Sequence, residues 1–154
     1  MSDEGRTAVY AAEVAAFEGT SYESLTGFDE LVATAAVITS ASWWPRGRVA
    51  IRRTRSDAVS SSARARGTAL VIRLAALQLT PATLIHELAH VLAGIETGHG
   101  AVFRRAHVDL VGYSFGDTEA GWLVDAYAAM GLGPGERTWA QPPVRRGAGG
   151  PLAL

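Results

Sequence analysis

The sequence predicts an α+β fold in which a small, mostly antiparallel sheet of three strands packs against one helix, with further helices before and after. Apolar residues recur at helical spacing early in the chain, alternating segments fill its middle, and helical spacing returns after residue 80. A chain of 154 residues can form one domain with one buried core. We therefore expect a single domain over residues 1–132. Glycine, proline and arginine dominate residues 133–154, which predicts an irregular or disordered tail.

Two helices are expected before the sheet. The first covers about residues 7–17, and its expected buried side consists of Val9, Tyr10, Val14 and Phe17. The second follows Phe28 and ends before the Ser/Trp/Trp/Pro/Arg/Gly stretch at residues 42–47.

The three strands are expected in the next segment of the chain. Residues 48–55 alternate, with Val49 and Ile51 on one side and arginines around them. Residues 63–66 and 68–74 flank Gly67, which predicts a hairpin whose last strand is the more apolar. The sheet therefore precedes the helix that begins after residue 80.

That helix contains the pattern H-E-x-x-H. Thr80 is a suitable N-cap, Pro81 fits the first helical position, and Gly94 is a suitable C-terminal cap. His86 and His90 are four residues apart, so both imidazoles project from one face, as two ligands of Zn²⁺ must. Glu87, beside them, is the residue type that takes a proton from zinc-bound water and passes it to a leaving group.

A third ligand is expected at His99. It lies between Gly98 and Gly100 in a turn, and glycine gives the backbone freedom to return the ring toward the helix. Three histidines with one open position are typical of a catalytic zinc site. Another zinc pattern, H-E-x-x-H-x-x-G-x-x-H, places the third histidine six residues after the second. That reading is excluded, because position 96 is Glu96. A glutamate ligand would be Glu96, in the tight turn, or the remote Glu119, so His99 is preferred.

After His99 two more helices are expected, one from Ala101 onward and one over residues 118–130. The remaining histidine, His107, is expected to pack or to support a ligand, and Asp109 is expected to be exposed. Tyr113 could donate a hydrogen bond to a developing oxyanion, or it could simply pack.

The composition limits the other possibilities. Cysteine is absent, so histidine and carboxylates are the only strong metal ligands. Neither a signal peptide nor a long apolar segment is evident, which predicts a cytoplasmic protein without a membrane partner. The formal net charge of −1 gives no overall electrostatic case for nucleic acid.

Eight arginines nevertheless lie between residues 46 and 73, against the single acid Asp57. They are Arg46, Arg48, Arg52, Arg53, Arg55, Arg64, Arg66 and Arg73. Such a cluster is either the solvated face of a sheet or a surface that binds a polyanion or an acidic substrate.

These residues resemble a known family. The pattern from His86 to His90, followed by His99-Gly100 and Phe103, is similar to the H-E-x-x-H and H-G-x-x-F pattern of SprT-like zinc metalloproteases. Small actinobacterial metallohydrolases resemble the chain more closely, including its Arg-x-x-Val-Tyr-Ala-Ala-Glu segment at residues 6–13. The resemblance covers roughly residues 6–132. It implies a zincin-like fold, zinc bound by the three histidines, and Glu87 as general base.

The expected function is a zinc-dependent metallohydrolase, with peptide hydrolysis as the leading reaction and a peptide or protein as substrate. If the strand at residues 68–74 forms a sheet edge, an extended peptide could pair with it. Two alternatives stay open. One is a zinc hydrolase of a small non-peptide amide, and the other is an inactive zinc-binding regulatory protein.

Overall fold

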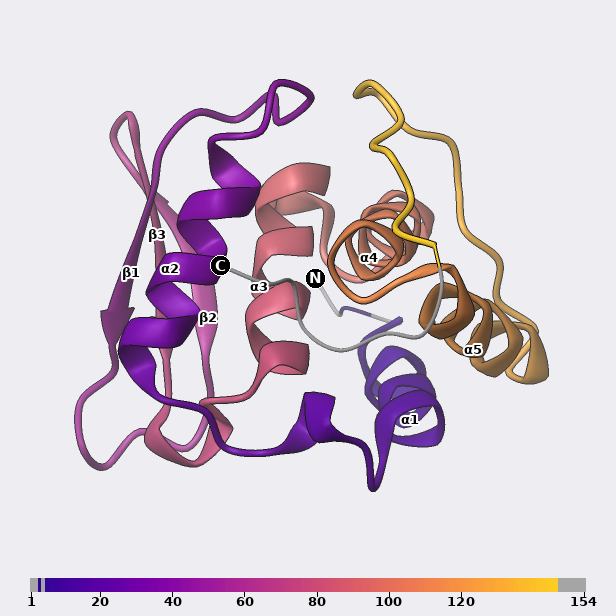
Figure 1. Cartoon of the computed structure of the whole chain (residues 1–154), viewed down its shortest axis with the longest axis horizontal. Helices are drawn as coiled ribbons and strands as arrows, with labels where there is room; N and C mark the ends of the chain where they lie inside the picture. Colours follow the sequence, from indigo (N-terminus) through magenta and orange to yellow (C-terminus); the bar gives the residue numbers. More distant parts are fainter. Residues whose placement is uncertain (1–2, 4, 147–154) are drawn as a thin grey trace.

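The structure is a computed structural model that describes residue 3 and residues 5–146 (Figure 1). It confirms the α+β class. The helices are α1 (Arg6–Phe17), α2 (Phe28–Thr39), α3 (Pro81–Ala93), α4 (Ala101–Ser114) and α5 (Asp117–Ala129), and the strands are β1 (Val49–Arg53), β2 (Ser62–Arg66) and β3 (Ala69–Leu74). Three short 3₁₀ turns are η1 (Ser21–Glu23), η2 (Ala76–Gln78) and η3 (Ile95–Thr97).

The sheet is mixed, and the prediction of a mostly antiparallel sheet is wrong in this respect. Its strand order is β1-β3-β2, with β3 parallel to β1 and antiparallel to β2. The expected hairpin is present, and Gly67 turns it with a φ of 61°. However, β3 folds back between the other two strands and occupies the centre, where it pairs on both sides. A peptide therefore cannot pair with β3, and the edges belong to β1 and β2.

One face of the sheet is covered and the other is open. Val49, Ile51, Ile72 and Leu74 are buried and alternate with positions that are less buried. Helices α2 and α3 both contact the sheet, and Figure 1 shows α1, α4 and α5 on the far side of α3. Helix α3 is therefore the centre of the molecule, between the sheet and the other helices.

Helix α3 begins and ends as predicted. The Thr80 side chain accepts a hydrogen bond from the Thr83 amide at 3.1 Å, Pro81 is the first helical residue, and Gly94 ends the helix with a φ of 108°. Its apolar residues are buried on both sides of the helix: Leu84, Ile85, Leu88, Val91 and Leu92. Burial on both sides fixes the direction in which its polar residues point.

Helix α1 differs from the prediction in the side that it buries. Val9 and Phe17 are buried, but Val14 is 54% exposed and Tyr10 is 40% exposed. Ala12 takes an inward position instead. The helix is thus rotated so that Tyr10 stands beside the histidines of α3, as described below.

The segment after α5 contains no helix or strand up to residue 146, yet it packs on α4. Arg137 donates two hydrogen bonds to the Asp109 carboxylate at 2.8 and 2.9 Å, and the Trp139 indole donates a third at 2.9 Å. The expectation that Asp109 is exposed is therefore wrong, because this segment buries it. Residues 147–154 of the predicted tail lie outside the described residues. Among the described residues, no helix is long and apolar enough to cross a membrane.

Candidate metal centre

The structure brings together the three histidines predicted from the sequence. His86 and His90 lie one turn apart on α3, and His99 lies between η3 and α4. Gly98, with a φ of 60°, reverses the chain immediately before His99. The turn is short, so the His99 ring reaches back to the helix that precedes it.

The three imidazoles converge on one point. His99 Nε2 is 3.2 Å from His86 Nε2 and 3.1 Å from His90 Nε2, and the three possible ligand atoms all lie within 4.8 Å of one another. Around a tetrahedral zinc ion with bonds of about 2.0–2.1 Å, neighbouring ligand nitrogens are about 3.3 Å apart. This buried histidine cluster could therefore bind a metal ion.

Two carboxylates are hydrogen-bonded to the Nδ1 atoms of two of the histidines, on the side of each ring away from the cluster. His86 Nδ1 is hydrogen-bonded to Glu13 Oε1, and His99 Nδ1 to Asp3 Oδ2. Asp3 Oδ1 also accepts a hydrogen bond from the His99 amide at 3.2 Å. In a neutral imidazole whose Nδ1–H donates to a carboxylate, the lone pair is on Nε2, the atom that points into the cluster. A proton can bridge two of the three nitrogens, whereas a metal ion bonds to all three.

The sequence predictions missed Glu13 and Asp3 as parts of the site. They lie 73 and 96 residues from the histidines that they contact. The resemblance included Glu13 at the end of its first segment, and that was the only available signal. Nothing in the local pattern of either residue indicates a metal site.

Glu13 also connects the site to a buried network. His107 Nε2 is 3.2 Å from Glu13 Oε1, and His107 Nδ1 is 2.7 Å from the Tyr127 hydroxyl. Burial, together with the neighbouring histidines, lowers the pKa of His107 well below its usual value, so the ring is neutral. It therefore donates from Nε2 to Glu13 and accepts from Tyr127. His107 thus helps to hold Glu13, the carboxylate that is hydrogen-bonded to the candidate ligand His86. This agrees with the predicted role of supporting a ligand.

Glu13, His86 and His107 form a second group whose ligand atoms are close enough for a metal ion. Hydrogen bonds explain this group without a metal, because Glu13 accepts from both imidazoles.

The cluster favours neutral imidazoles at two of its three positions. Burial and the charges of His86 and His99 lower the pKa of His90 to about 3. Burial also lowers the pKa of His99, although Asp3 partly opposes this. At His86, burial lowers the pKa, but the hydrogen bond and charge of Glu13, together with the charge of Glu87, raise it by more.

Glu87 is a buried carboxylate directed into a small cavity. It is 5% exposed, and within the described part of the chain its side chain has no hydrogen-bond partner. A cavity of about 40 Å³ is lined by Tyr10, Glu13, Ser60, Ser61, Gln78, Thr83, His86 and Glu87. Burial raises the pKa of Glu87 to about 7, with a further contribution from Glu13, while His86 acts in the opposite direction. Buried carboxylates are normally hydrogen-bonded, so an unpartnered one beside a histidine cluster indicates a functional role.

Two aromatic rings enclose the cluster. Phe103 contacts all three histidines, with ring centroids 4.5 to 5.0 Å apart. Tyr10 stacks on His86 at 5.2 Å and contacts His99 at 5.6 Å. Tyr113, which the sequence offered as a possible oxyanion donor, instead packs edge-on against Trp43 at 5.1 Å.

Comparison of the chain with protein-family models, with curated proteins and with solved structures found no match.

Proposed function

We propose that this protein is a zinc-dependent metallohydrolase that cleaves peptide bonds, with His86, His90 and His99 as metal ligands and Glu87 as general base. The observation that carries the proposal is the convergence of three imidazoles, with His99 Nε2 3.1 to 3.2 Å from the other two Nε2 atoms and carboxylates hydrogen-bonded to two of the rings. The resemblance of residues 86–103 to SprT-like metalloproteases supports the same assignment.

The donor set suits zinc and leaves one coordination position for substrate or water. The group contains three histidines and, among the described residues, no fourth protein ligand. When bound, zinc lowers the pKa of a coordinated water and polarises a carbonyl group. This open position supports a catalytic site over the alternative of an inactive regulatory protein.

The role of the chain's own residues follows from their positions. Glu87 lines the same cavity as His86 and has no side-chain hydrogen bond to any described residue, so its carboxylate can accept a proton from water and deliver it to a leaving amine. Glu13 and Asp3 hold His86 and His99 in the tautomer that presents Nε2. Phe103 and Tyr10 limit the access of water to the rings.

An extended substrate would lie along β2, because β2 is the sheet edge near the site. The residues that precede it, Ser60 and Ser61, line the cavity of Glu87, and β2 itself contacts α3. Pairing with a strand edge gives affinity through the backbone and leaves specificity to the side chains.

The small size of the cavity favours a second candidate, hydrolysis of a small non-peptide amide. A space of about 40 Å³ holds a water molecule or a group of similar size, but not a large side chain. The two candidates differ in substrate length. A peptidase should lose activity when its peptide is shortened to an amide of one residue, and a small-amide hydrolase should not.

The first experiment is metal analysis of protein purified without a metal-binding tag. We expect one equivalent of zinc in the wild type and a sharp loss in His99→Ala, because that variant removes one of three ligands. Glu87→Gln should retain zinc but lose hydrolysis of a peptide library by at least about a hundredfold. Zinc unchanged by His99→Ala, or full activity in Glu87→Gln, would overturn the proposal.

A further inference from the structure

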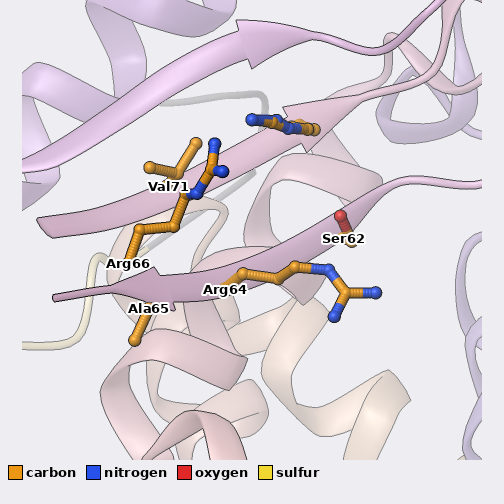
Figure 2. A pocket seen from close by; sticks show the side chains of 6 residues that line it. Ser62, Arg64, Ala65, Arg66 and Val71 are labelled. Atoms are coloured by element: carbon orange, nitrogen blue, oxygen red, sulfur yellow. The ribbon is translucent and has the colours of Figure 1, made fainter.

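The open face of the sheet contains a positively charged hollow. Its volume is about 360 Å³, and its lining consists of Ser62, Arg64, Ala65, Arg66, Val71 and Arg73. Figure 2 shows this face turned toward the reader, with helices behind the sheet and Ala65 directed away from the neighbouring arginines. Among the described residues, no carboxylate lines the hollow.

The strand register explains why the charges gather here. Arg64 and Arg66 are two residues apart on β2, so both project from the open face. Arg73 lies opposite Ser62 on the central strand, and Arg52 of β1 lies opposite Arg73. The positive face therefore crosses all three strands.

These charges have no carboxylate partner in the part of the chain that the structure describes. None of Arg64, Arg66 and Arg73 forms an ion pair with a described residue. Like charges on neighbouring strands disfavour the fold unless an anion lies between them. The hollow thus suits a ligand that carries several negative charges.

The segment that leads into β2 connects the candidate active site with the hollow. Ser60 and Ser61 line the cavity of Glu87, and the next residue, Ser62, lines the hollow. In the described structure, no β2 residue has a backbone hydrogen bond outside the sheet, so the outer edge of β2 is unpaired. A peptide that extends from Glu87 along this edge would pass Arg64 and then Arg66.

We propose that the protein selects peptides with acidic side chains at alternate positions, bound as a fourth strand along β2. This inference rests on the proposed function. Alternate side chains of an added strand point to the open face, where they lie beside Arg64 and Arg66. The side chains between them point to the other face, where Ala63 and Ala65 leave space.

The strand rise also locates these acidic positions. Arg64 and Arg66 lie about 10 and 17 Å from Ser61 along the strand, at about 3.3 Å per residue. The acidic residues should therefore lie about three and five residues from the bond that is cleaved. A nucleic acid is the less suitable occupant, because the residues described around the hollow include no aromatic ring on which a base could stack.

The test compares binding of two labelled peptides to the zinc-loaded Glu87→Gln variant by fluorescence anisotropy. One peptide alternates glutamate with alanine, and the other alternates glutamine with alanine. The glutamate peptide should bind about tenfold more tightly, and adding Arg64→Glu and Arg66→Glu should abolish that difference. The matched control, Arg48→Glu with Arg55→Glu, changes the net charge equally and should preserve the difference, because neither residue lines the hollow.

Equal binding of the two peptides, or equal effects of the two double variants, would overturn the inference. Preferential binding of a labelled deoxythymidine oligonucleotide, lost in the Arg64→Glu/Arg66→Glu variant, would also overturn it and would assign the face to nucleic acid. If the glutamate peptide binds through these arginines but wild-type protein hydrolyses no peptide, the inference holds and the proposed function fails.

Discussion

The two carboxylates that hold the candidate ligands are placed in contrasting surroundings. Glu13 lies within helix α1, its side chain is 14% exposed, and it accepts from both His86 and His107. Asp3 precedes α1, its side chain is 34% exposed, and among the described residues its carboxylate is hydrogen-bonded to His99 alone. Burial raises the pKa of Asp3, but the hydrogen bonds and charge of His99 lower it by more, to a value below the usual range.

Both carboxylates accept a hydrogen bond from a histidine, but the loss of each should affect the protein differently because one is more buried than the other. Removing Glu13 leaves two imidazole N–H groups buried without an acceptor, whereas removing Asp3 leaves a ring that water can reach. Glu13 should therefore matter for folding and for metal binding, and Asp3 mainly for metal binding.

The largest effect is expected for Glu13→Ala. Leaving two buried donors unsatisfied should lower the free energy of unfolding by about 2–5 kcal/mol, and zinc affinity should fall about 10- to 100-fold. Urea unfolding of the metal-free protein and competition with a chromogenic chelator measure the two effects. Glu13→Gln, which keeps one acceptor oxygen, is the control and should lose less stability. A Glu13→Ala protein as stable as the wild type would contradict the buried network.

Glu87 extends the comparison, because it is a buried carboxylate that accepts no hydrogen bond from any residue that the structure describes. Its pKa is raised from 4.5 to about 7 in the folded protein. The folded state therefore favours the protonated form, so the contribution of Glu87 to stability is full below about pH 4.5 and is lost as the pH rises through about 7.

Between pH 5 and pH 8, metal-free wild-type protein should lose up to about 3 kcal/mol of stability relative to Glu87→Gln, which cannot ionise. Urea unfolding of both proteins after chelator treatment, at both pH values, measures this difference. A difference that does not change with pH would mean that Glu87 is not buried in an apolar environment.

The smallest effect is expected for Asp3→Ala. Zinc affinity should fall about tenfold, because His99 loses the partner that fixes its tautomer, while the free energy of unfolding should change by less than about 1 kcal/mol. The same chelator and urea measurements apply. Asp3→Asn, which keeps an acceptor for the His99 amide, is its control. Equal losses of stability in the alanine variants of Asp3 and Glu13 would show that the two supports do not differ.

Sequence alone determined the elements whose rules are local. The cap at Thr80, the proline at 81 and the apolar spacing defined α3, and helical geometry then required His86 and His90 to share a face. The turn of glycines around His99 was equally local, so the sequence predicted all three members of the cluster. The hairpin at Gly67 was predicted for the same reason.

Only the tertiary structure decided which distant groups complete the site. Glu13 and Asp3 reach their histidines across 73 and 96 residues, and no periodic pattern encodes such contacts. The central position of β3 and the burial of Asp109 beneath residues 137–139 could not be predicted from the sequence either. Strand order and docking depend on how whole elements pack. Local spacing can place a side chain on a face of a helix, but only packing determines what that face meets.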